Sequence, residues 1–201
     1  HISTKLICRE PDVSAGGDMG EELGFYSRPP SVELTDGCYL VKERKPELSF
    51  RLFDLLQKDG RHGLIVTRRH PAKLRKEREL GDVRVVWLSH TPGEDFHNPT
   101  ALGSLNKLIC RFIQDNDRTA VLMDGLEYLI LNNNFVQTLL FVEHVNEFVM
   151  QHPSIVLMPV NPGALEGKEL ALLERNLEVL EGEELWRELE REEVIKLIDT
   201  Y

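Results

Sequence analysis

Asp124 and Glu127 are the residues whose type and spacing most clearly suggest chemistry. They stand three residues apart in "VLMDGLEYLI", where Asp124 ends an apolar run. A carboxylate at the end of a buried strand can hold the magnesium ion of a nucleoside triphosphate while a glycine-rich loop holds the phosphates. The first hypothesis is therefore magnesium-dependent phosphoryl transfer.

The phosphate loop that this chemistry needs is missing. It has the form G-x-x-x-x-G-K-[ST] between the first strand and its helix, because glycine backbone must wrap the phosphates. The corresponding stretch reads "YLVKERKPELSFRLF" and contains no glycine. Its bulky residues cannot readily form the nest of amides that cradles a triphosphate. We therefore do not expect ATP hydrolysis by this machinery, and a non-catalytic protein is favoured over an enzyme. No catalytic residue, metal or cofactor is predicted.

A structural role competes with the magnesium role for the same two carboxylates. Asp-x-x-Glu at a helix entry is a variant of the capping box, in which the first side chain accepts from first-turn amides and the second reaches back. Both charges also suit the positive end of a helix dipole. Without a phosphate loop, helix capping by Asp124 and Glu127 is the favoured interpretation.

A wider set of polar residues follows the apolar runs directly. In an open parallel α/β sheet, ligands bind beyond the carboxyl ends of the strands. The alternative is that these are ordinary polar loops. The residues selected by this rule are Lys42, Glu43, Arg68, Arg69, His70, His90, Asp124, Glu127 and Asn161. The ligand-binding candidates kept from this set are Lys42, Arg68, Arg69, His70, Asp124 and Glu127.

One segment, "TRRHPAKLRKER" at 67–78, concentrates basic residues. It could bind phosphate, nucleic acid or an acidic protein surface. It lacks interleaved aromatic residues, so stacking on single-stranded bases is poorly supported. The competing interpretations are a solvated basic helix and pairing with the acidic C-terminal segment.

The elements that must position these residues alternate regularly along the chain. Five short apolar runs read as strands that are covered on both faces. Strand–helix alternation predicts a mainly parallel sheet with helices on both faces, a three-layer α/β domain. The predicted strands are 38–41, 63–67, 83–89, 119–124 and 154–160, with "LEVL" at 177–180 as a possible edge strand. The predicted helices are 46–60, 71–79, 99–116 and 135–152.

Composition and charge limit the possible domain organisation, partners and location of the protein. We expect an extension or linker at 1–35, an α/β domain at 36–181 and an acidic amphipathic helix at 182–201. The net charge of −10 argues against nonspecific adhesion to nucleic acid or anionic membranes. No apolar run is long enough to cross a bilayer, and we expect a cytoplasmic protein.

Five stretches together resemble an archaeal family, domain of unknown function 835. They are "YLVKE", "GLIVTRRHPAKLR", "VVWLS", "VLMDGLEYLI" and "ALLERNLEVLE", and the resemblance covers about residues 36–181. It implies a degenerate relative of RecA- or KaiC-type ATPase cores that has lost its phosphate loop. The resemblance brings no catalytic residues with it.

These observations predict a non-catalytic, RecA-like regulatory or signalling module that binds a protein partner or itself. The first alternative is an anionic-ligand or nucleotide-binding protein, possibly an enzyme, that uses the strand-end residues. The second alternative is nucleic-acid binding through 67–78.

Overall fold

The computed structural model describes residues 34–187 and 189. Within this range, Thr35–Trp186 form one compact unit, and the contacts discussed below lie inside it. Nearly all of the predicted 1–35 extension and most of the predicted final helix lie outside the described residues.

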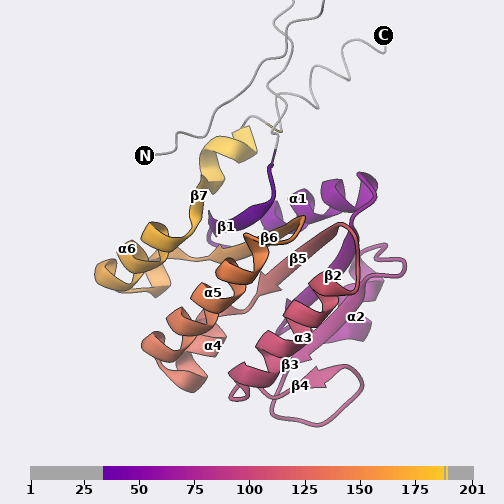
Figure 1. Ribbon diagram of the computed structural model, residues 1–201, viewed down its shortest axis with the longest axis horizontal. Coiled ribbons are helices and arrows are strands. Elements are labelled where there is room, and N and C mark those ends of the chain that lie inside the picture. Colours follow the sequence, from indigo (N-terminus) through magenta and orange to yellow (C-terminus); the bar gives the residue numbers. More distant parts are fainter. Residues whose placement is uncertain (1–33, 188, 190–201) are drawn as a thin grey trace, which may run out of the picture. The chain divides into compact units, whose positions relative to one another are not determined.

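Seven strands form a single sheet in the order β4-β3-β2-β5-β6-β1-β7, and every pairing is parallel (Figure 1). The strands are β1 (Gly37–Lys42), β2 (His62–Thr67), β3 (Arg84–Leu88), β4 (Phe96–His97), β5 (Thr119–Asp124), β6 (Ser154–Val160) and β7 (Glu178–Glu181). Only β6 separates β1 from β5 in the sheet. The loop after β1 and the end of β5 therefore lie near each other at the carboxyl ends of the strands.

Helices cover both faces of the sheet (Figure 1). One face carries α1 (Glu47–Lys58) and α2 (Pro71–Glu77). The other face carries the remaining helices, which are α3 (Leu102–Gln114), α4 (Leu126–Asn133), α5 (Phe135–Val149) and α6 (Gly167–Asn176). The predicted three-layer α/β class with a mainly parallel sheet is confirmed.

Side chains alternate between the two faces along each strand, as the pleat requires. Leu40, Val121 and Met158 pack with α3, α4 and α5 in one buried cluster. The intervening strand residues are also buried, because α1 and α2 cover the second face. Burial on both faces explains why the strands read as continuous apolar runs.

Apart from β5 and β6, the predicted elements differ from the observed ones by one to three residues at one or both ends. The helix predicted from Pro99 begins at Leu102, because the Asn98 side chain instead accepts a hydrogen bond from the Thr100 amide and forms a turn. The strand β4 was not predicted, since two residues carry no periodic signal. The other predicted elements are present, and "LEVL" does contribute the edge strand β7.

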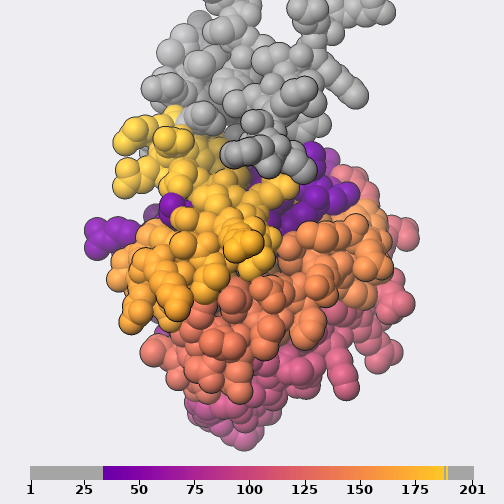
Figure 2. All heavy atoms as spheres, turned by 60° about the vertical axis from the view of Figure 1, so that its left-hand side comes forward, coloured from indigo at the N-terminus to yellow at the C-terminus, as the bar shows by residue number. Residues whose placement is uncertain are grey.

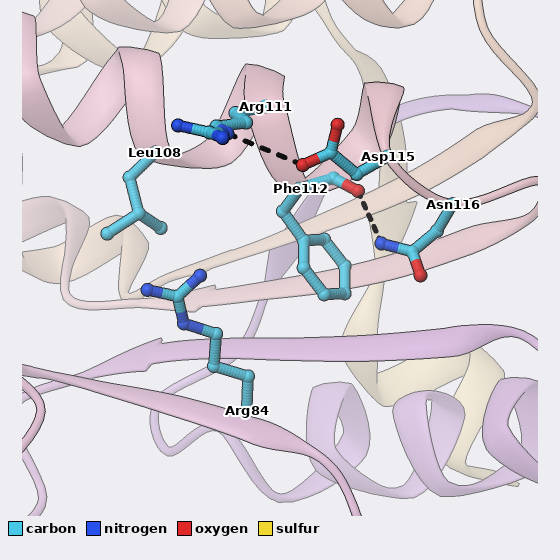
Figure 3. Close-up of a pocket in the computed structure, with 6 residues that line it drawn as sticks. All are labelled: Arg84, Leu108, Arg111, Phe112, Asp115 and Asn116. Atoms are coloured by element: carbon cyan, nitrogen blue, oxygen red, sulfur yellow. Dashed lines mark hydrogen bonds and ion pairs between the residues drawn. The ribbon is translucent and has the colours of Figure 1, made fainter.

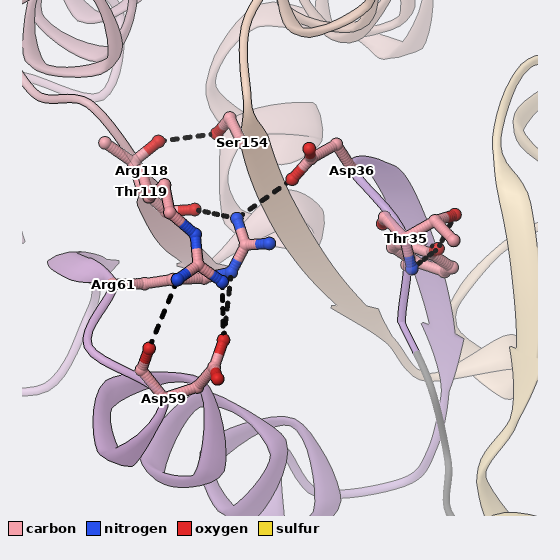
Figure 4. A network of polar contacts seen from close by, with 8 residues as sticks. Thr35, Asp36, Asp59, Arg61, Arg118, Thr119 and Ser154 are labelled. Atoms are coloured by element: carbon pink, nitrogen blue, oxygen red, sulfur yellow. Dashed lines mark hydrogen bonds and ion pairs between the residues drawn. The ribbon is translucent and has the colours of Figure 1, made fainter. Parts of the chain in front are cut away.

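A polar network around Arg61 connects the amino-terminal ends of several strands (Figure 4). The Arg61 side chain is buried and donates to the Asp36 carboxylate at 2.9 Å and to the Thr119 carbonyl at 3.3 Å. Arg118 donates to Asp59 at 2.7 Å, and Asp59 also lies 3.9 Å from Arg61. The network ties the end of α1 to the starts of β1, β2 and β5.

Candidate functional site at the carboxyl ends of the strands

The central contact of the site joins β5 to β2. Thr67 and Asp124 are register partners, and the Thr67 hydroxyl donates to the Asp124 carboxylate at 2.8 Å. The same hydroxyl accepts from the Arg69 amide at 3.0 Å. Asp124 is mostly buried, and this burial raises the pKa of its carboxyl group, against the smaller effects of the Thr67 hydrogen bond and the nearby Arg69.

Helix capping by Asp124 and Glu127 is a wrong prediction. The residue that precedes α4 is Gly125, and no side chain caps the helix there. Asp124 is engaged by Thr67, and Glu127 accepts a hydrogen bond from the Asn161 amide at 2.8 Å instead of reaching back to the cap. The capping interpretation failed because both carboxylates find partners on neighbouring strands, which local sequence does not reveal.

A third carboxylate, Glu43, fills the position where a phosphate loop would act. It directly follows β1, and its two oxygens accept from the amides of Leu48 at 2.9 Å and Ser49 at 3.0 Å, in the first turn of α1. The Ser49 hydroxyl also donates to it. Burial raises the pKa of Glu43, while these hydrogen bonds and the Ser49 hydroxyl act in the opposite direction.

Glu43 was among the residues that the strand-end rule selected, but it was not kept as a ligand-binding candidate. It opens the stretch "ERKPELS" after the first strand, which reads as part of a charged loop. A helix N-terminus attracts anions because its first amides are unpaired and the dipole is positive there. In this protein a side chain of the chain itself takes that place.

Two of the six candidates, Lys42 and His70, form contacts that stabilise the fold. The Lys42 amine contacts Glu181 at 2.7 Å and Glu174 at 2.9 Å, and these hydrogen bonds raise its pKa. The His70 ring accepts from the Ala72 amide at 3.3 Å and so caps α2. The strand-end cluster is therefore formed by Arg68, Arg69, Asp124 and Glu127, with Glu43 added.

The sequence pattern of the family described as "Protein of unknown function (DUF835)" matches residues 42–177. The chain belongs to the DUF835 family. No curated protein matches it at a significant level. Among solved structures it resembles the Pyrococcus horikoshii OT3 protein PH0250, with a TM-score of 0.54 at 12% identity over 73% of this chain and 81% of that one. A KaiC-like protein from the same organism, PH0186, matches with a TM-score of 0.48 at 13% identity over 69% and 70% of the two chains.

The resemblance noted in the sequence is thus confirmed at the level of the family. PH0250 supports the fold alone, because the identity is low. In the DUF835 chain the strand order places β1 and β5 on either side of β6, which is consistent with the RecA-like core that the resemblance implied. The loop between β1 and α1 contains no glycine and carries Glu43.

The arginines of this DUF835 domain lie on aromatic rings. The Arg68 guanidinium lies 4.1 Å from the centre of the Tyr128 ring, and Arg69 lies 5.2 Å from that of Phe50. Arg69 also forms an ion pair with Glu77 at 3.5 Å. Both side chains remain exposed, so they are the strand-end cations that a ligand could reach.

Several other basic residues of 67–78 form contacts within the domain. Arg78 donates to Asp54 at 2.9 Å, and Arg75 donates to the Val83 carbonyl at 3.0 Å. Lys73 lies 4.0 Å from Glu77. Five of the six basic residues of 67–78, all but Arg78, nevertheless remain exposed to solvent.

Two further observations bear on the site's chemistry. In the described part of the chain, no group of three or more His, Cys, Asp or Glu side chains is placed to hold a metal ion. Over the same residues, no helix combines the length and apolar character needed to traverse a bilayer.

Proposed function

We propose that this domain is a non-catalytic, RecA-like regulatory or signalling module that acts by binding a protein partner or a second copy of itself. The observation that carries the proposal is the Glu43 carboxylate on the first amides of α1. A nucleotide phosphate would need those amides, and it would meet a carboxylate already bound to them. Like charges so close repel strongly in a partly buried site.

The other groups that nucleotide chemistry would use are also engaged. Asp124 accepts from Thr67, and Lys42 is paired with two glutamates on the far side of β1. Burial raises the pKa of Asp124. These contacts favour a structural role for the strand-end carboxylates.

The outer face of α5 supports the binding role. Its exposed residues are Val136, Gln137, Leu140, His144 and Glu147. Two of these five residues, Val136 and Leu140, are apolar. Exposed apolar side chains that lie together are typical of interaction surfaces. Figure 2 shows the orange surface of α5 beside the surface of α6.

Two neighbouring features extend this surface. Leu131, in the last turns of α4, is 82% exposed, while Val136 and Leu140 are 64% and 50% exposed. A hollow of about 400 Å³ lies between the start of α3 and α5, and Leu140, Phe141 and His144 contribute to its lining. An exposed apolar stripe next to a hollow can accept an anchoring side chain from a partner.

Light scattering on the purified chain, followed by pull-down from native lysate, tests the proposal. Leu140→Asp and Val136→Asp are expected to abolish self-association or partner capture. Leu55→Asp is the matched control, because Leu55 is 45% exposed on α1, a helix of the opposite layer. A strictly monomeric protein with no partner and clear nucleotide turnover would contradict the proposal.

Ligand binding by the strand-end residues is the second candidate. The observation that favours it is the exposure of Arg68 and Arg69 near Asp124, since guanidinium groups can clamp a phosphate or carboxylate. Thermal-shift measurements with ATP, ADP and cyclic dinucleotides test it. An increase in Tm that Arg69→Gln removes supports this candidate, and no shift with any of these anions counts against it.

A further inference from the structure

A polar hollow lies at the amino-terminal ends of the strands, opposite the strand-end site. It has a volume of about 390 Å³ and is lined by Arg84, Leu108, Arg111, Phe112, Asp115 and Asn116. Arg84 is the first residue of β3, and the others belong to the end of α3 and the residues just after it. This volume falls in the range of small-molecule sites.

Its cations are only partly neutralised. The Arg84 side chain makes no hydrogen bond or ion pair with any residue that the structure describes, while its backbone pairs with β2. Arg111 pairs through Nε with Asp115 at 3.4 Å, and that contact leaves its terminal nitrogens free for another acceptor. Figure 3 shows both arginine side chains bordering the same hollow, from the strand below and the helix above. The two arginines and Asp115 leave a local charge of +1 in a chain whose net charge is −10.

The wall between the two arginines is apolar and fixed. Leu108 and Phe112 are partly buried and pack against the main core cluster. In Figure 3 the Phe112 ring reaches down from α3 toward the strand that carries Arg84. A flat or apolar group placed beside this ring would lose contact with water while its charged end met a guanidinium.

Asn116 adds a directional group. Its side-chain amide donates to the Phe112 carbonyl at 2.7 Å, which fixes the orientation of the amide and leaves its oxygen as an acceptor. The lining thus combines two cationic donors, the Asp115 carboxylate, the Asn116 acceptor and the two apolar side chains of Leu108 and Phe112. Four of the six lining residues are therefore polar or charged.

We propose that this hollow binds a small organic anion, a single carboxylate or phosphate joined to an apolar or aromatic body. The anion lies between Arg84 and Arg111, and the body packs against Phe112 and Leu108. The site is independent of the α5 surface and of the strand-end arginines, so its failure would leave the proposed function untouched.

Two-dimensional NMR titration of the full chain with phenyl phosphate, benzoate and inorganic phosphate tests the proposal. Phenyl phosphate or benzoate is expected to shift amide signals in β3 and the end of α3, and the stronger of the two identifies the headgroup. Inorganic phosphate is expected to bind more weakly, because it has no apolar body. Arg84→Gln and Arg111→Gln should each weaken binding about tenfold, the loss typical of one charge-assisted contact.

Arg118→Gln serves as the matched control, because Arg118 is an arginine outside the hollow that pairs with Asp59. This change should not alter the affinity. The proposal is overturned if neither aromatic anion binds at millimolar concentration, if inorganic phosphate binds as tightly as they do, or if binding survives both Arg84→Gln and Arg111→Gln.

Discussion

The Thr67 hydroxyl and the Asp124 carboxylate form a hydrogen bond of 2.8 Å across the paired ends of β2 and β5. This bond replaces the magnesium contact that the Asp124 sequence pattern first suggests. It also holds a carboxyl group in a mostly buried position, where desolvation raises its pKa.

Asp124→Asn is expected to make stability less dependent on pH. An acid with a raised folded-state pKa contributes stability below its unfolded pKa, about 3.9. That contribution is lost as the pH rises through the folded-state value. The gain in unfolding free energy of Asp124→Asn over wild type should therefore grow from about pH 4 to neutral pH. Urea unfolding at several pH values measures it, and Thr67→Val should enlarge the pH dependence. An equal difference at all pH values contradicts this account.

Glu43→Ala is expected to lower the free energy of unfolding by about 1–2 kcal/mol, because the Leu48 and Ser49 amides lose their acceptor. Glu43→Gln retains one side-chain oxygen and should recover part of the loss. Chemical denaturation of both variants gives the comparison. Glu47→Ala is a suitable control, because Glu47 is an exposed glutamate in the same turn with no side-chain hydrogen bond of its own among the described residues. Equal stability of Glu43→Ala and wild type would show that the contact is not needed.

Arg61→Ala should destabilise the domain by about 1–3 kcal/mol, since it leaves the Thr119 carbonyl and Asp36 without their buried donor. Arg118→Ala, which removes an exposed pair with Asp59, should cost less than about 1 kcal/mol. Thermal and urea unfolding of the two variants should separate them clearly. If both variants lose the same free energy of unfolding, the burial of Arg61 does not strengthen the contribution of its contacts.

Asn134→Ala is expected to cost more than Asn134→Gly. Asn134 has φ 78° between α4 and α5, and its side chain accepts from the Gln137 amide at 3.0 Å. Alanine loses the cap and is strained at this φ, for a combined cost of about 1–3 kcal/mol. Glycine loses the cap but adopts the backbone freely. Circular dichroism melts of both variants give the order, and a more stable alanine variant would contradict it.

The sequence predicted the buried strands well and the site only in part. The strands 119–124 and 154–160 were predicted to the residue, because burial on both faces produces unbroken apolar runs. The break at Asn134 was also anticipated by starting a helix at Phe135.

The contacts of the candidate residues depended on strand order, which periodicity does not contain. Lys42 turns toward Glu174 and Glu181 because β7 pairs with β1. Glu127 reaches Asn161 because α4 passes the end of β6. Glu43 was selected as a strand-end residue, but its contact with α1 was not predicted, because its main partners are backbone amides and no side-chain type marks them in the sequence.

The Glu43 carboxylate is covalently part of the chain that it binds, so its effective concentration at the first amides of α1 is far above that of any dissolved nucleotide. A nucleotide phosphate would have to displace this intramolecular anion before it could reach the same amides. The proposed module would then take the duration of its action from the abundance and residence time of the molecules that it meets, and not from a nucleotide cycle of its own.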